Sequence, residues 1–164
     1  KKEIDPQVLA QALKATLQRI PSFNVRIRRG LFWYYFEKNP NEPDVLPDIK
    51  NPCYRIKFKE NKGFLFRVFY LGDRISVDVY HALCDGYGAS VFIFTLVGEY
   101  LRLTGEEVDY NKFVLDVKDS PRSSEVEDSY SRYFRTVITL PCKFVGIKMH
   151  VFFAGTHEEI SFIA

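Results

Sequence analysis

The stretch Arg74-Ile-Ser-Val-Asp-Val-Tyr-His-Ala-Leu-Cys-Asp-Gly86 decides the fold, because it joins a strand pattern to a sharp turn and the start of a helix. Ile75, Val77 and Val79 alternate with polar neighbours, which predicts a half-buried strand over residues 74–80. His81 keeps the parity of these apolar positions, so the alternation predicts that its imidazole faces the buried side. An imidazole in a partly dry site beside a turn is a candidate general base.

Two helices are predicted on either side of this strand in the sequence. Asp5-Pro6 places an N-cap acceptor before a proline, and apolar residues then recur at helical spacing as far as Ile20. Residues 89–103 form the second predicted helix, which ends at Thr104-Gly105. This helix is apolar over much of its circumference, so we expect it to pack against a sheet.

The remaining strands are predicted to form an antiparallel meander. Segments predicted as strands cover residues 23–28, 31–36, 54–59 and 64–71, with turns between most of them and a proline-rich loop over 39–52. Residues 143–153 and 160–163 are further strand candidates. The predicted fold class is α+β, a mostly antiparallel sheet with helices packed on one side.

Composition limits the function classes. A chain of 164 residues with 46% hydrophobic residues is expected to form one globular domain. The net charge of +2 gives no reason to expect a nucleic-acid partner, and no apolar run is long enough for a membrane span. Cys53, Cys84 and Cys142 are widely spaced, which argues against a disulfide framework and a zinc site and predicts a cytoplasmic location.

The pattern His81-x-x-x-Asp85-Gly86 resembles the active-site motif of the chloramphenicol-acetyltransferase-like acyltransferases. That superfamily includes peptide-synthetase condensation domains, plant acyl-CoA-dependent acyltransferases and bacterial alcohol acetyltransferases, and the last type is the most similar. The resemblance extends over about residues 1–134, where further segments fit in order: residues 4–13, 19–23, 32–34 and 130–134.

The resemblance implies a role for each residue of the motif. His81 would be the general base, while Asp85 would be structural and would pair with an arginine, for which Arg26, Arg55 and Arg67 are the candidates. Gly86 would let the backbone turn where a side chain would clash. The implied fold is one subdomain of the superfamily's architecture.

The chain also departs from the family pattern. Many members have a second histidine directly before the base, and Tyr80 occupies that position here. Two-subdomain members have a second half that closes the substrate channel, and they have a strand before the first helix. We therefore expect an N-terminal subdomain over residues 1–104, an acidic linker or crossover over 105–134 and a tail over 135–164. Such a half is expected to expose apolar surface, through which it would self-associate or bind a missing C-terminal half.

The function implied by the resemblance is acyl transfer from a thioester to an alcohol or amine, with His81 as the base. Acyl-CoA is the expected co-substrate, and no permanently bound cofactor or metal is expected. Two other functions stay open. One is a non-catalytic binding or scaffold module of the same fold, and the other is a condensation domain that takes its acyl group from a carrier protein.

Other side chains allow alternative hypotheses. Cys84 lies three residues from His81, so a Cys/His nucleophile pair is conceivable, although a small buried thiol is the favoured interpretation. His150 and His157 are conceivable metal ligands, together with His81 or Asp85, but their spacing matches no known metal pattern and ordinary histidines are favoured.

Two simpler interpretations concern the arginines and the motif itself. Arg26, Arg28 and Arg29 would suit a coenzyme A phosphate, although solvation of a strand's polar face is favoured. In the simplest interpretation of the motif, His81 is an ordinary histidine and Asp85 is the N-cap of the following helix.

Overall fold

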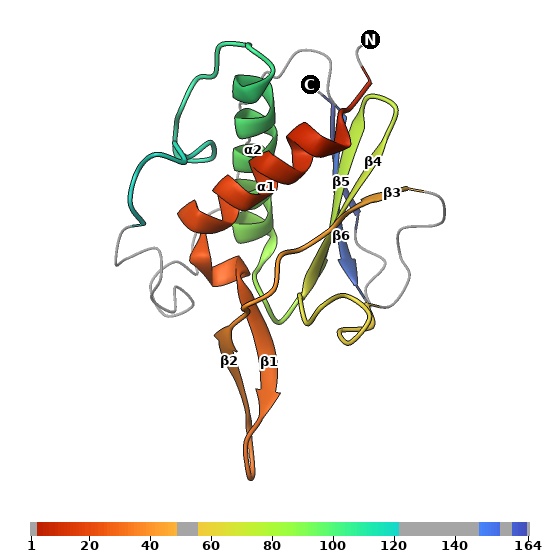
Figure 1. The fold of residues 1–164 in the computed structure, drawn as a ribbon, viewed down its shortest axis with the longest axis vertical. Helices are drawn as coiled ribbons and strands as arrows, with labels where there is room; N and C mark the ends of the chain where they lie inside the picture. Colours follow the sequence, from red (N-terminus) through yellow and green to blue (C-terminus); the bar gives the residue numbers. More distant parts are fainter. Residues whose placement is uncertain (1–2, 49–55, 122–147, 155–158, 164) are drawn as a thin grey trace.

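The computed structural model describes residues 3–48, 56–121, 148–154 and 159–163. Figure 1 shows the elements in chain order: α1 (Pro6–Arg19), the 3₁₀ helix η1 (Pro21–Phe23), β1 (Val25–Arg29), β2 (Tyr34–Lys38), β3 (Val45–Pro47), β4 (Phe66–Leu71), β5 (Arg74–Tyr80), α2 (Gly86–Leu103), β6 (Lys148–Ala154) and β7 (Glu159–Ile163). Both predicted helices are confirmed, and Asp5 caps α1 by accepting hydrogen bonds from the backbone of Gln7 and Val8 at 2.8 and 3.3 Å.

Five strands form one sheet in the order β3-β4-β5-β6-β7, and β1 pairs with β2 in a separate hairpin. The pairs β1–β2, β4–β5 and β6–β7 are antiparallel, whereas β3–β4 and β5–β6 are parallel. The α+β class is therefore confirmed, while the antiparallel meander is only partly right. The parallel neighbours of the β4–β5 hairpin come from the proline-rich loop and from the end of the chain.

The strand predicted over residues 54–59 is wrong for its described part, residues 56–59. Residues 57–63 instead fold back on themselves: Gly63 N–H donates to the Phe58 carbonyl at 2.7 Å, and Asn61 N–H donates to the Lys57 carbonyl at 3.0 Å. Lys62 and Gly63 have positive φ angles of 52° and 88°. The turn that the sequence predicted at Gly63 is thus longer than expected. It includes residues 57–59, which were predicted to belong to the preceding strand.

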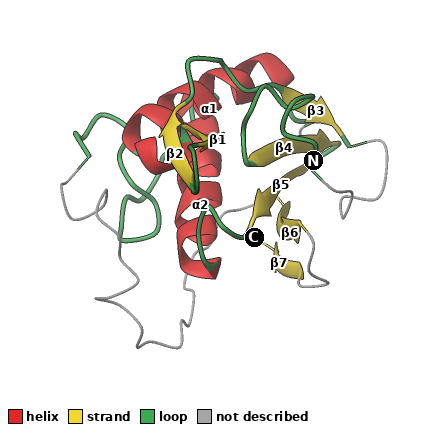
Figure 2. Ribbon diagram, turned by 90° about the horizontal axis from the view of Figure 1, so that it is seen from below, coloured by secondary structure: helices red, strands yellow, loops and turns green. Residues whose placement is uncertain are grey.

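Both helices lie on the same side of the five-stranded sheet, as predicted (Figure 2). The core joins α1 and α2 to the apolar face of β4 and β5, which carries Phe66, Val68, Ile75, Val77 and Val79. The Phe23 and Phe92 rings are stacked inside this core, with centroids 4.0 Å apart. This burial supplies the main stabilisation of the fold.

The segment that follows α2 is attached to it and is not simply a solvated linker. Phe113 and Val114 are buried in the core. The Thr95 hydroxyl donates to the Phe113 carbonyl at 3.4 Å and accepts from Leu115 N–H at 3.1 Å. Residues 105–121 therefore belong to the packed unit, although many of their side chains are exposed.

The final strands also join the sheet, since β6 pairs with β5 along its whole length and β7 pairs with β6. The two late strand candidates are thus confirmed for their described parts, residues 148–153 and 160–163, and these parts of the expected tail belong to the same sheet as β5. Residues 122–147 lie outside the described part of the chain. Where the structure describes the chain, no helix is long and apolar enough to cross a membrane.

Candidate functional site

The His-x-x-x-Asp-Gly motif forms the connection between β5 and α2. β5 ends at Tyr80, residues 81–83 form a turn, and α2 begins at Gly86. Two backbone hydrogen bonds hold the turn: Tyr80 N–H donates to the Leu65 carbonyl at 2.7 Å, and Leu83 N–H donates to the Tyr80 carbonyl at 2.8 Å. The motif therefore sits between a central strand and a long buried helix.

His81 is exposed, which contradicts the expectation that its imidazole faces the buried side. The alternation of β5 does not extend to His81, because the strand ends one residue earlier and the chain turns. Tyr80 and Tyr87, on either side of the turn, are 37% and 42% exposed, and the Tyr80 ring makes an edge contact with Phe58 at 5.3 Å. The imidazole is thus accessible from solvent.

Asp85 is the N-cap of α2. Its carboxylate oxygen Oδ1 accepts a hydrogen bond from Gly88 N–H at 2.8 Å, and its carbonyl accepts from Ala89 N–H at 3.0 Å. In the described residues no arginine pairs with Asp85. Arg26 and Arg67 bind other carboxylates, and Arg55 lies outside those residues. The predicted arginine anchor is therefore wrong for two candidates, because the helix terminus uses the carboxylate instead.

Gly88, in the first turn of α2, is in close contact with the preceding turn. A Cβ on Gly88 would lie 3.0 Å from the Cys84 Cβ. Gly86 has no positive φ angle and is the first residue of α2. The φ angle of Gly86 therefore does not require a glycine, whereas the close approach of Cys84 limits the size of the residue at position 88.

Arg67 and Asp78 form a buried ion pair across β4 and β5, at register partners. Arg67 Nε donates to Asp78 Oδ2 at 3.1 Å, and its Nη2 contacts the same oxygen. The Asp78 side chain is fully buried, and desolvation raises the pKa of its carboxyl even though Arg67 acts in the opposite direction. The pair fixes the strand that leads to His81.

Cys84 is ill suited to act as a nucleophile with His81. Burial, together with the neighbouring Asp85 carboxylate, raises the pKa of the Cys84 thiol to about 12. A thiolate is the nucleophilic form, and it is rare at neutral pH when the pKa is so high. The favoured interpretation of Cys84 as a small packed thiol therefore holds. Cys53 and Cys142 lie outside the described residues.

The other candidate residues do not gather around His81. Arg26 and Arg28 both bind Glu37, with Arg28 Nε at 2.9 Å from its Oε1. His150 lies on β6, at the register partner of Ser76, and His157 is outside the described residues. No group of three or more potential metal ligands occurs within the ranges that the structure describes.

Comparisons with protein-family models, with curated proteins and with solved structures gave no match for this chain. The functional assignment therefore depends on the motif and its geometry.

Two features of the molecule were not predicted from the sequence. The Arg67–Asp78 pair was foreseeable. In a hairpin with the two-residue turn Gly72-Asp73, residues at equal distances from the turn lie opposite each other, and Arg67 and Asp78 are such a pair. The second feature is the exposure of residues 31–36: the predicted pairing of β1 with β2 is present, but the two strands form a separate hairpin and not part of a buried sheet. Its signal was an apolar run without alternation directly after Gly30.

Proposed function

We propose that this protein takes part in acyl transfer from a thioester to an alcohol or amine, with His81 as the general base. The observation that carries the proposal is the position of His81: an accessible imidazole in a short turn between a central strand and a capped, buried helix. Such a turn fixes the backbone of the base at the solvent-exposed surface.

The reaction would proceed without a covalent acyl-enzyme. His81 would remove the proton from the acceptor hydroxyl, and the oxygen would attack the thioester carbonyl to form a tetrahedral oxyanion. Collapse of this intermediate would break the carbon–sulfur bond and expel the thiolate, which would take the proton from His81. The products are an ester and a free thiol, or an amide and a thiol when the acceptor is an amine.

The structure also supports different roles for Asp85 and His81 within the motif. Asp85 serves the helix by capping its first turn, and the Arg67–Asp78 pair holds β5. These contacts position the turn that carries His81. The proposal therefore assigns the chemistry to His81 and treats Asp85 as a positioning residue.

The test is a thiol-release assay with acetyl-CoA and primary alcohol or amine acceptors. We expect His81→Ala to lower the rate by about 10²–10⁴-fold, which is typical for loss of a general base. Because His81 is exposed and lies outside the strand, its removal should change the free energy of unfolding by no more than about 0.5 kcal/mol. The exposed neighbour Ala82→Ser is the matched control and should keep the wild-type rate.

The same assay separates the alternative functions. An equal rate in His81→Ala and wild type would overturn the role of His81. Release from a phosphopantetheinyl carrier protein but not from acetyl-CoA would indicate a condensation-type donor. Absence of release from either donor would favour the non-catalytic binding module.

A further inference from the structure

The β1–β2 hairpin extends away from the rest of the molecule along its longest axis (Figure 1). Asn39 N–H donates to the Asn24 carbonyl at 2.9 Å and closes the base of the hairpin. At the far end, residues 30–33 form a four-residue loop in which Gly30 N–H donates to the Trp33 carbonyl at 2.7 Å. The hairpin is therefore an ordered projection with a defined end.

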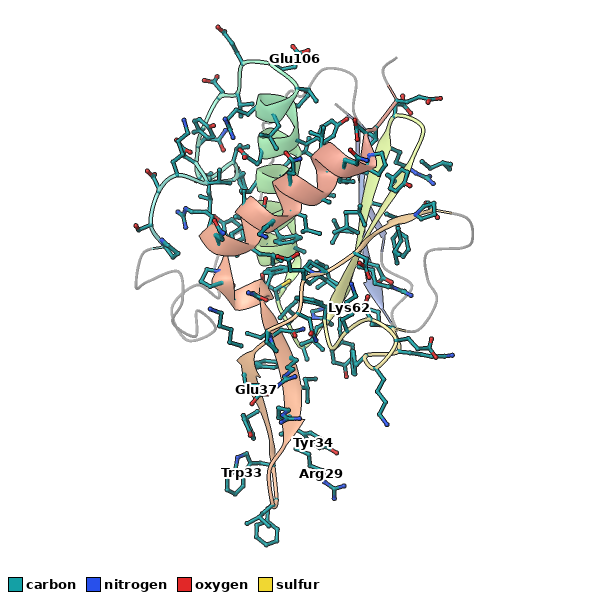
Figure 3. The ribbon with its side chains drawn as sticks, viewed as in Figure 1. Arg29, Trp33, Tyr34, Glu37, Lys62 and Glu106 are labelled. Atoms are coloured by element: carbon teal, nitrogen blue, oxygen red, sulfur yellow. The ribbon has the colours of Figure 1, made fainter. Side chains whose placement is uncertain are left out.

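The end of this projection is apolar and exposed. We call residues 31–36 the hairpin tip. Leu31, Phe32 and Trp33 are 84%, 91% and 61% exposed, although such residues are usually buried. Figure 3 shows Trp33 and Tyr34 at the end of the hairpin, far from the two helices. A cluster of this kind marks an interaction surface.

The apolar surface surrounds the hairpin instead of covering one face. Tyr34, Tyr35 and Phe36 follow one another on β2 and are 70%, 46% and 48% exposed. Successive residues of a strand point to opposite faces, so aromatic rings are exposed on both. A protein that docked on one face would leave the other face in water. A medium that encloses the tip from all sides fits this arrangement better.

The residues next to the hairpin tip are basic. Within residues 25–38, four basic residues accompany one acidic residue, Glu37, which already binds Arg26 and Arg28. Arg29 and Lys38 are exposed, and Arg29 is the register partner of Tyr34 at the start of the loop. The projection thus has an apolar end and a positively charged stem.

We propose that the hairpin tip inserts into the interface of a lipid bilayer that contains anionic lipids, with Arg28 and Arg29 at the level of the phosphates. Trp and Tyr favour the membrane interface, where one part of the ring system is apolar and another is polar. Basic side chains beside an inserted segment are attracted to anionic headgroups. The tip lies at the end of the long axis, so the body of the molecule does not obstruct a flat surface (Figure 1).

The size of the tip favours a bilayer over a protein partner. The apolar run is six residues long, whereas a stable protein–protein interface uses about 20–30 residues on each side. A second copy of the chain would have to enclose the same narrow projection on all sides. A bilayer needs no complementary surface, because lipids rearrange around an inserted segment.

Trp33 allows a direct test, since it is the single tryptophan of the chain. The native chain is mixed with phosphatidylcholine vesicles, with and without 30% phosphatidylserine, and binding is measured by co-sedimentation and tryptophan emission. We expect binding, a blue shift of the emission, and quenching by brominated lipid tails, all stronger with phosphatidylserine. Loss of each basic side chain should weaken binding to the anionic vesicles about fivefold, as Arg29→Gln would show.

The matched variants are Phe32→Ser at the tip and Leu71→Ser at an exposed apolar position on β4. Phe32→Ser should weaken vesicle binding at least tenfold, while Leu71→Ser should leave it unchanged. Both side chains are exposed, so circular dichroism should show an unaltered fold. Absence of vesicle binding overturns the proposal, as does equal binding of the two variants. A Trp33 blue shift without lipid, accompanied by dimers in light scattering, would also overturn it and would assign the tip to a second copy.

Discussion

Arg67 and Asp78 show how a single buried pair bears on the strand that ends at His81. Removing one partner leaves a buried charge uncompensated, which typically costs about 3–5 kcal/mol. We expect Asp78→Ala to lower the free energy of unfolding by this amount, as measured by denaturant titration. Replacing both residues, as in Arg67→Met with Asp78→Leu, should recover most of the loss, because the double variant leaves no unpaired buried charge.

The control for this experiment is Asp44→Asn, which removes the exposed pair between Asp44 and Lys62. Exposed pairs contribute little, so the unfolding transition should hardly move. If Asp78→Ala were as mild as Asp44→Asn, the Arg67–Asp78 pair would not stabilise β5.

The Cys84 thiol gives a prediction about reactivity and pH. With a pKa of about 12 it is almost entirely protonated at pH 8, whereas an ordinary thiol of pKa about 8.5 is substantially ionised. Alkylation by iodoacetamide at Cys84, followed by peptide mass spectrometry, should therefore be about 10³-fold slower in the folded chain than in urea. The rate should rise about tenfold per pH unit between pH 8 and 11. Equal rates in the folded and unfolded chains would contradict the burial of the thiol.

At the scale of the element, Asp85 defines the start of α2. Removal of an N-cap side chain costs about 1 kcal/mol, while asparagine caps a helix nearly as well as aspartate. We expect Asp85→Ala to lower the thermal midpoint and Asp85→Asn to restore most of it. An arginine partner would give a different result, since asparagine cannot replace a paired charge. A large decrease of the thermal midpoint in Asp85→Asn would therefore indicate that Asp85 pairs with an arginine, as the sequence resemblance implied.

Gly98 determines how closely residues 105–121 approach α2. A Cβ on Gly98 would lie 2.8 Å from Cγ1 of Val114, which is too close for two carbon atoms. Gly98→Ala gains about 1 kcal/mol of helix propensity, but overpacking costs about 1–3 kcal/mol. We expect a net loss of stability in denaturant unfolding. The double variant with Val114→Ala removes the clash and should be more stable than Gly98→Ala alone.

The helices and the β4–β5 hairpin were predictable because their signals are local. Caps, apolar stripes and a two-residue turn lie within the elements themselves. The parallel partners of the hairpin, β3 and β6, were not predictable, because pairing between distant segments has no local signature. At the candidate site, the position of His81 in a turn was predictable. Its exposure was not, because the alternation stops where β5 ends.

At the scale of the whole molecule, the two strands that pair with β5 lie at very different distances from it in the sequence. β4 precedes it through a two-residue turn, whereas β6 arrives only after α2 and the long segment that follows. Contacts between distant parts of a chain form slowly, because the entropy of closing a long loop must be overcome first.

This arrangement has a consequence during synthesis on the ribosome. The β4–β5 hairpin and both helices emerge and collapse before the residues of β6 exist. For that interval β5 is an edge strand, with an unpaired row of backbone N–H and C=O groups beside a strongly apolar core. The nascent chain is therefore most prone to aggregate in the window between the emergence of α2 and the arrival of β6, and a chaperone that covers the β5 edge would act in that window.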